Sequence, residues 1–327
     1  MILYIVQRLA LLPLLMLIYS FVIFAIIQAP PGDFLSAYVA TLASSGSSIS
    51  ADQIAALRHQ YGLDQPFVVQ YFLWMQNLFH GDFGLSLEYQ RPNADLIGEQ
   101  IGLTIALALF SFVLTWAISV PAGIYSATHP RSLGDHVLTV VNYVGVATPN
   151  FMLALILMWV AFAYFDISVT GLYSPEFVDA KWSVARVMDL LGHIWLPALV
   201  LGIAGTARLS RIMRANLLDE LNKPYVTTAR AKGIAERAVI TRHVVRNALI
   251  PVVTLVALSM PAVFGGAIVT EQIFRIPGIG SLLISSILAN DTPVIMAVTF
   301  VFACLVILFN LLADILYGWL DPRIAYR

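Results

Sequence analysis

Side chains suited to covalent or metal chemistry are few in this 327-residue chain, and their spacing matches no catalytic motif. A nucleotide-binding P-loop needs a lysine directly after a glycine, because that lysine and the loop amides hold the phosphates. The lysines are Lys181, Lys223 and Lys232, and none of them follows a glycine. The six histidines are scattered and no serine lies in a GxSxG setting, which leaves metal catalysis and a hydrolase triad without support. We therefore expect no catalytic residue, no metal site and no ATP-hydrolysing centre here.

The charged residues that do gather form one basic segment between long apolar runs. From Arg208 to Arg246 the sequence holds nine Lys or Arg and three Asp or Glu. Lys and Arg near the ends of membrane spans resist translocation, so this segment is predicted on the cytoplasmic side. Pro224 suits the first turn of a helix, and Gly233 suits the residue that ends one. The pattern predicts a short helix over residues 225–232.

This short helix is the strongest candidate for a surface that a cytosolic protein binds. The candidate residues are Tyr225, Thr227, Thr228, Ala229, Arg230, Ala231, Lys232 and Gly233. Ala229 and Ala231 are expected on one face, where their small side chains allow another protein to approach closely. The residues alone leave an alternative open, which is a solvated basic loop that follows the charge rule for membrane spans.

The composition is that of a membrane protein. Charged residues make up 11% of the chain, whereas they are typically about a quarter of a soluble domain. A helix needs roughly 20 mostly apolar residues to cross a bilayer, and six stretches qualify. They are about Leu9–Ala29, Ile101–Ala127, Leu138–Phe165, Trp195–Ile212, Ala248–Val269 and Pro293–Leu320. We therefore predict an all-α, polytopic membrane protein with six transmembrane helices, in a single domain over residues 1–327.

The distribution of Lys and Arg predicts the orientation. With both termini inside, the cytoplasmic side receives thirteen of the 18 Lys and Arg residues and the opposite side receives five. This asymmetry predicts cytoplasmic termini. It also predicts a long external segment over residues 30–100 and a cytoplasmic coupling segment over residues 222–247, between the fourth and fifth spans. The net charge of −1 gives no reason to expect a nucleic-acid partner.

The long external segment carries several local predictions. Ser50 and Gln53 have capping-box spacing, which predicts a helix starting there. The aromatic run Phe67–Phe79 predicts an amphipathic piece at the outer interface. A turn at Pro30–Asp33 and a flexible SSGSS stretch at Ser44–Ser48 precede them, and whether that stretch is ordered stays open.

Two further places hold candidate residues. The external segment Glu271–Asp291 contains RIPGIG, and its proline and glycines predict a break followed by a scoop-like half-helix. In the sixth apolar run, Asp314 follows Asn310 by four residues. An acid inside a span is a functional candidate, but packing against a partner helix and a substrate or proton role both stay open.

Sequence blocks along nearly the whole chain carry a resemblance to one family. They include YIVQRLALLPLLM near the start, YGLDQP at Tyr61–Pro66, GDFGLS at Gly81–Ser86, ARAKG at Ala229–Gly233, HVVRNALIPV at His243–Val252, EQIFRIPGIGSLL from Glu271 and NLLADILYGWLDPR from Asn310. In this order they resemble the membrane (permease) subunits of bacterial binding-protein-dependent ABC importers, in the dipeptide/oligopeptide permease branch. The family's general Glu-Ala-Ala motif is replaced here by Thr227, Thr228 and Ala229. No role that needs a carboxylate at Thr227 is therefore expected.

The resemblance implies a pore-forming subunit of an ATP-driven peptide importer in the cell inner membrane. Its implied partners are a second homologous permease, two cytosolic ABC ATPases and an external or periplasmic solute-binding protein. ATP and Mg would be bound by the ATPases, with no cofactor in this chain. The helix Tyr225–Gly233 would couple it to an ATPase. The outer-gate and binding-protein contacts would be Glu271, Ile276, Pro277, Gly278 and Gly280.

Other interpretations stay open. The same importer type serves oligosaccharides, glutathione and nickel chelates, and selectivity lies largely with the separate binding protein. A secondary carrier or channel that works without ATP is a second class, disfavoured because the spans are nearly free of charge. A membrane enzyme is a third class, disfavoured by the absence of catalytic clusters.

Overall fold

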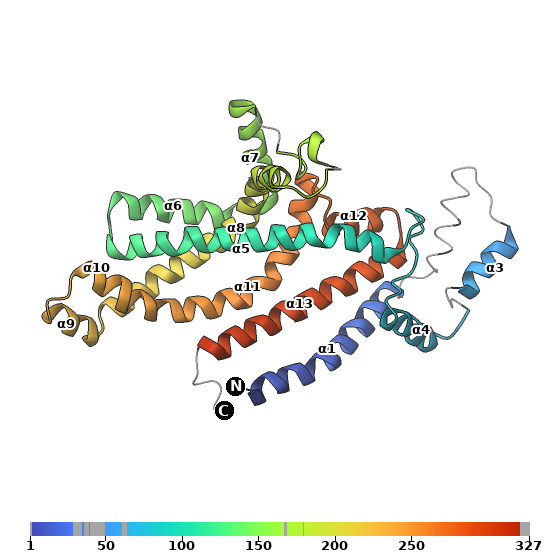
Figure 1. Ribbon diagram of the computed structural model, residues 1–327, viewed down its shortest axis with the longest axis horizontal. Helices are drawn as coiled ribbons and strands as arrows, with labels where there is room; N and C mark the ends of the chain where they lie inside the picture. Colours follow the sequence, from blue (N-terminus) through green and yellow to red (C-terminus); the bar gives the residue numbers. More distant parts are fainter. Residues whose placement is uncertain are drawn as a thin grey trace. The chain divides into compact units, whose positions relative to one another are not determined.

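The computed structural model describes residues 2–28, 35, 39, 50–60, 64–166, 169–178 and 180–320, and in these residues the chain is helical without a β-strand (Figure 1). The main helices are α1 (Ile2–Gln28), α3 (Ala51–Gln60), α4 (Phe67–Phe79), α5 (Asn93–Thr128), α6 (Leu133–Ala147), α7 (Asn150–Phe165), α8 (Val184–Leu221), α9 (Pro224–Ala231), α10 (Glu236–Ala238), α11 (Val245–Phe274), α12 (Ile279–Leu288) and α13 (Thr292–Leu320). A 3-10 turn, η1 (Pro175–Phe177), precedes α8, and a π-helix, η2 (Val239–Val244), precedes α11.

The described helices include enough apolar length for a polytopic membrane protein. Four of them are long and apolar enough to cross a bilayer, and the number rises to six if each of two broken helix pairs is one span. The predicted fold class, all-α with several spans, is therefore confirmed. The side on which each terminus lies stays a prediction.

The third expected span, Leu138–Phe165, is not one continuous helix. The structure ends α6 at Ala147 and begins α7 at Asn150, with a bend of 115° between them. Proline disfavours the helical conformation of the residue before it, and Thr148 accordingly has extended dihedrals, φ −92° and ψ 123°. The break thus follows from Pro149, which the apolar pattern of the run had concealed.

The fourth expected span lies inside a much longer helix. α8 contains 38 residues, which at about 1.5 Å per residue is roughly 57 Å, against a hydrocarbon core of about 30 Å. Its start is capped by Ser183, whose hydroxyl accepts the N–H of Arg186 at 3.2 Å. The helix is therefore longer than one membrane span, and its C-terminal end leads into the predicted coupling segment.

The chain divides into two compact units. The first unit comprises Leu103–Ile276 with both chain ends, and the second comprises Val6–Gly102 with Pro277–Ile307. In the first unit, α8 packs against α6, α7 and α11 (Figure 1).

Two apolar clusters lie along α8 in this first unit. The α7 cluster contains Leu107, Ala154, Val169, Leu172, Ile194, Leu196, Ala198, Val200, Leu201, Ala267, Phe274 and Ile276. The α9 cluster contains Ala127, Leu209, Met213, Leu217, Val226, Ala229, Val239, Val244, Ala248 and Val252. The two clusters include successive stretches of α8, so this helix connects them.

The second unit is organised by aromatic packing of α4 on α1. Phe24 lies 5.2 Å from Phe67, 5.6 Å from Tyr71 and 5.7 Å from Trp74, measured between ring centroids. The Tyr71 hydroxyl is 2.9 Å from that of Ser20. These contacts place one face of the Phe67–Phe79 helix against α1, as its amphipathic pattern leads one to expect.

The predicted capping box is present in the second unit. The Ser50 N–H donates to Gln53 Oε1 at 3.0 Å, and the Gln53 N–H donates to Ser50 Oγ at 3.3 Å. The start of α3 is therefore confirmed. The predicted turn at Pro30–Asp33 and the SSGSS stretch at Ser44–Ser48 lie outside the described residues.

Candidate functional site

The coupling segment begins with a short helix, α9, and one face of this helix packs against the rest of the first unit. Pro224 is the first residue of α9, as predicted, and only two residues separate it from the end of α8. Val226 is fully buried and Ala229 is 9% exposed, and both belong to the α9 cluster. Residues three apart share a helix face. Val226 and Ala229 therefore form the inner face of α9.

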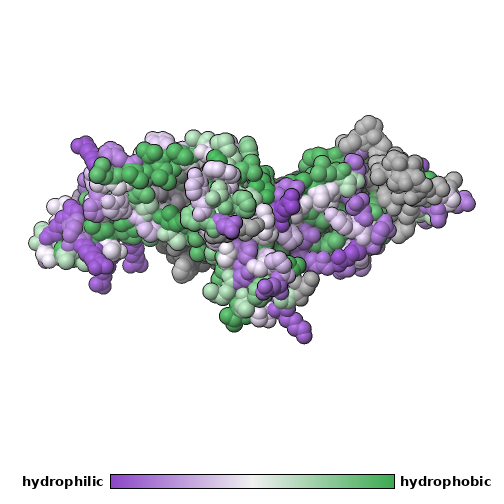
Figure 2. Space-filling model, turned by 90° about the horizontal axis from the view of Figure 1, so that it is seen from above, coloured by the Kyte–Doolittle hydropathy of each residue, from purple (hydrophilic) through white to green (hydrophobic). Residues whose placement is uncertain are grey.

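The opposite side of α9 is open to solvent. Its exposed residues are Thr227, Thr228, Arg230, Ala231, Lys232 and Gly233, and these define what we call the outer face. In Figure 2 the end of the molecule that carries α9 and α10 is predominantly hydrophilic, next to an apolar surface. The expectation that Ala229 and Ala231 share one face is wrong, because residues two positions apart in an α-helix point about 200° away from each other. Ala229 packs inward and Ala231 points outward.

Gly233 ends α9 in a Schellman motif. The Gly233 N–H donates to the Arg230 carbonyl at 2.9 Å, and the Ile234 N–H donates to the Ala229 carbonyl at 3.3 Å, which is the characteristic pair of bonds. Gly233 has φ +74°, and a Cβ at this position would meet no atom within 4 Å. The left-handed backbone favours glycine here, and the space beside it is open to a partner.

Polar contacts hold α9 at both of its ends. The Tyr225 hydroxyl donates to Glu220 of α8 at 2.6 Å. Burial, and then the bond to Glu220, raise the pKa of Tyr225 above its ordinary value. Near the end of α9, Arg230 donates to both carboxylate oxygens of Glu236 in α10, at 3.0 and 2.6 Å. The hydrogen bond from Arg230 lowers the pKa of Glu236. Sequence reasoning missed both acids, because nothing in a single sequence marks these partners.

The π-helix after α10 was not predicted either. Val239 and Val244 lie at the two ends of η2, and both are fully buried in the α9 cluster. Five residues advance an α-helix by about 500°, which would leave these two valines about 140° apart. A π-turn bonds residues five apart and so brings both valines to the same side. The wider turn thus allows η2 to pack both valines against the inner face of α9, immediately before α11 begins.

The residues expected at the outer gate are mostly buried. In the first unit, Glu271 is 0% exposed and accepts a 2.6 Å hydrogen bond from Thr104 Oγ1, and Ile276 is 1% exposed. In the second unit, Gly278 and Gly280 are buried and Pro277 is exposed. Four of the five residues therefore expose little surface in this chain, and their assignment to the outer gate and binding-protein contacts stays a prediction. The predicted half-helix is present as α12, which begins directly after Gly278.

The remaining candidates lie in α13. Asn310 is exposed and Asp314 is half-buried. Among the residues that the structure describes, no group of three or more His, Cys, Asp or Glu could hold a metal ion. The choice between a packing role and a transport role for Asp314 stays open.

Comparison with known proteins gives a consistent result over the whole chain. Residues 119–326 match the family described as the inner membrane component of binding-protein-dependent transport systems, and residues 1–108 match the N-terminal membrane component of such systems. The chain is 40% identical over 325 residues to the oligopeptide transport system permease protein AppB of Bacillus subtilis (strain 168), with 99% of each chain covered. It is 35% identical to the dipeptide transport system permease protein DppB of Alkalihalophilus pseudofirmus, with 100% of each covered. It is also 35% identical to the glutathione transport system permease protein GsiC of Escherichia coli (strain K12), with 99% of each covered.

Proposed function

The chain belongs to the family of inner membrane components of binding-protein-dependent transport systems, and we propose that it is the pore-forming permease subunit of an ATP-driven peptide importer. It is a multi-pass protein of the cell inner membrane. Full-length similarity to permeases named for oligopeptides and dipeptides supports the choice of substrate. Glutathione is the second candidate, because a relative of equal coverage is named for it.

The proposed complex contains a second homologous permease, two cytosolic ATPases and an external solute-binding protein. The family description names the binding protein directly. The ATPases are proposed because the chain belongs to the family of binding-protein-dependent transport systems, in which separate ATPase subunits would drive uptake. This chain supplies the membrane passage and the surface through which the ATPase acts.

The observation that carries the proposal is the division of α9 into two faces. Val226 and Ala229 are embedded in the chain's own core, whereas Thr227, Ala231 and Lys232 are exposed. A force applied to the outer face therefore moves the α9 cluster with it, since packed cores resist continuous deformation. ATP-driven closure of the ATPases would displace α9 as part of a rigid body and re-pack the spans between two discrete arrangements.

The Gly233→Asp variant tests the docking surface. We expect it to remain in the membrane, to lose the ATPase on co-purification and to abolish uptake, because the new side chain occupies the open space beside the outer face. The local strain of a left-handed residue, about 1–2 kcal/mol, accompanies the change.

Gly81→Asp is a matched control for that strain. Gly81 follows α4 with φ +79°, a Cβ there would meet no atom within 4 Å, and the same two Schellman bonds surround it. We expect Gly81→Asp to keep the ATPase bound. If Gly233→Asp retains the ATPase and a normal uptake rate, the docking assignment is wrong. Uptake that survives ATP depletion but collapses with the proton gradient would instead indicate a secondary carrier.

A further inference from the structure

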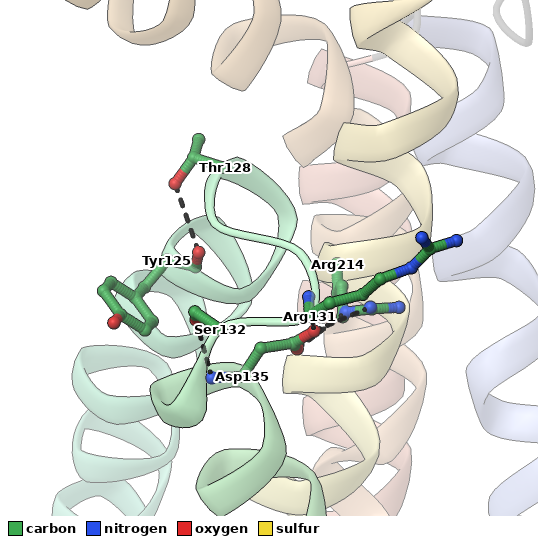
Figure 3. Close-up of polar contacts among 6 residues, drawn as sticks. All are labelled: Tyr125, Thr128, Arg131, Ser132, Asp135 and Arg214. Atoms are coloured by element: carbon green, nitrogen blue, oxygen red, sulfur yellow. Dashed lines mark hydrogen bonds and ion pairs between the residues drawn. The ribbon is translucent and has the colours of Figure 1, made fainter.

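An ion pair with a buried carboxylate joins the start of α6 to α8 in the first unit. The Arg214 guanidinium of α8 donates from Nε to Asp135 Oδ1 at 3.1 Å and from Nη2 to Asp135 Oδ2 at 3.0 Å (Figure 3). The Asp135 side chain is 5% exposed and that of Arg214 is 36% exposed. Such two-pronged contacts fix orientation as well as distance. The neutral contacts further along the two helices, such as Asn142 with Ser210 at 3.4 Å, lack that specificity.

The short loop before α6 is built around the same carboxylate. The Arg131 N–H donates to Asp135 Oδ2 at 3.0 Å, and Arg131 has a left-handed φ of +62°. Ser132 caps α6 by accepting the Asp135 N–H at 3.1 Å (Figure 3). A Cβ at Gly134 would overlap the Tyr125 ring of α5. The end of α5, the loop and the start of α6 are therefore held in one arrangement, with Asp135 aimed at α8.

Arg214 lies where α8 is already fixed to α9. Its neighbours Met213 and Leu217 are fully buried in the α9 cluster together with Val226 of α9. At its C-terminal end, α6 is separated from α7 by the break at Pro149. A displacement of α9 thus reaches α8 through apolar packing, and reaches the start of α6 through Asp135.

We propose that the Asp135–Arg214 pair is a positioning contact that transmits movement of α9 to α5 and α6 during transport. This inference rests on the proposed function, since it assumes that an ATPase moves α9. Separating α8 from α6 would break both hydrogen bonds between the Arg214 guanidinium and the Asp135 carboxylate, and breaking such a charged pair at a buried carboxylate is unfavourable. The two helices therefore move together, and the ends of α5 and α6 follow the coupling segment.

The first test measures the coupling ratio, in peptides imported per ATP hydrolysed, for the full complex in proteoliposomes. Asp135→Asn preserves shape but removes the charge that Arg214 binds. We expect about tenfold fewer peptides per ATP, within the range that single residues exert on coupling between sites, while the ATPase remains bound. Arg208→Gln is the matched control, because Arg208 is an exposed arginine on the same helix, and it should leave the ratio unchanged.

A distance measurement reports the movement directly. Spin labels at Val140 of α6 and Ala215 of α8, both exposed, are introduced after the native Cys304 is replaced by Ala. In the wild-type background the label distance should be the same with and without ATP. In Asp135→Asn it should change or broaden when ATP binds.

The outcomes separate this proposal from the proposed function. A normal coupling ratio and an unchanged label distance in Asp135→Asn would overturn the positioning role while leaving α9 docking intact. The docking surface is tested separately, by whether Gly233→Asp loses the bound ATPase. If Asp135→Asn does not assemble, Arg214→Lys decides, since it keeps the charge but loses the two-pronged geometry. A lowered ratio in that variant supports the proposal, and a wild-type ratio overturns it.

Discussion

The α7 cluster and the α9 cluster lie along the same helix, α8, but differ in how the chain covers them. At the α7 cluster the chain covers its own core. The Gly171 N–H donates to the Phe274 carbonyl at 2.8 Å, and Ser174 donates its N–H and hydroxyl to the Asp189 carboxylate at 2.8 and 2.6 Å. At the α9 cluster the covering element, α9, has an outer face that remains exposed. The first cluster is a completed core, and the second is a core that presents a surface.

The polar contacts of the two clusters follow the same division. Beside the α7 cluster, Glu271 is fully buried against Thr104, where an unpaired group is costly. Beside the α9 cluster, Arg230 and Glu236 have side chains that are 45% and 54% exposed, where an ion pair contributes little. Substitutions at the first cluster should therefore appear as lost stability. Substitutions on the outer face of α9 should appear as lost function.

The largest expected effect comes from placing one carboxylate on either face of α9. Val226→Asp removes a fully buried side chain and buries an unpaired charge, which should cost about 3 kcal/mol or more. We expect the variant to be lost or severely destabilised in thermal unfolding of the purified protein. Thr228→Asp puts the same group on an exposed residue of the same helix and should change stability by about 0.5 kcal/mol or less.

Transport then distinguishes the two faces. Thr228→Asp should lower peptide uptake although the protein is folded and present in the membrane, because Thr228 belongs to the outer face. If both variants unfold alike, α9 does not have two distinct faces. If Thr228→Asp is stable and fully active, the outer face is not a docking surface.

The sequence predicted the elements near α9 better than their orientation. Pro224 and Gly233 act through their own backbones, so the position of α9 could be predicted locally. Which side of α9 packs inward depends on Met213 and Leu217 of another helix, and no local pattern in eight residues decides it. The partner of Glu271 is 167 residues away, so its burial was equally hidden. Pro149 was visible, but the long apolar run around it favoured a single span.

An intermediate effect is expected at the buried carboxylate beside the α7 cluster. Glu271→Ala removes the acceptor of the Thr104 hydroxyl and leaves a cavity, and should destabilise the protein by about 1–3 kcal/mol. The measurement is the unfolding midpoint in detergent, together with Thr104→Val and the double variant. Coupling between the two substitutions would identify the bond as the cause.

The same variant tests whether Glu271 contacts the solute-binding protein. Because Glu271 is buried, we expect Glu271→Ala to leave the affinity for that protein unchanged. A large loss of affinity with unchanged stability would contradict this expectation and identify Glu271 as a contact residue.

The smallest expected effect concerns the exposed pair between Arg230 of α9 and Glu236 of α10, and it depends on pH. The hydrogen bond from Arg230 holds the pKa of Glu236 below its ordinary value of 4.5. A carboxylate with a lowered folded-state pKa contributes stability above its unfolded-state pKa and loses it as the pH falls through the folded-state value. Wild type should therefore be slightly more stable than Glu236→Gln at neutral pH, and the two unfolding midpoints should converge as the pH falls through the lowered folded-state pKa.

Salt then tests whether this contribution is a surface effect. At 1 M salt the screening length is about 3 Å, so the difference between wild type and Glu236→Gln should shrink at neutral pH as well. A difference that persists in high salt would mean that the pair is shielded from solvent, and the α9 cluster would then be closed on this side like the α7 cluster. A difference that vanishes, combined with a defect in uptake, would mean that Arg230 and Glu236 act on the partner bound at the outer face rather than on the fold.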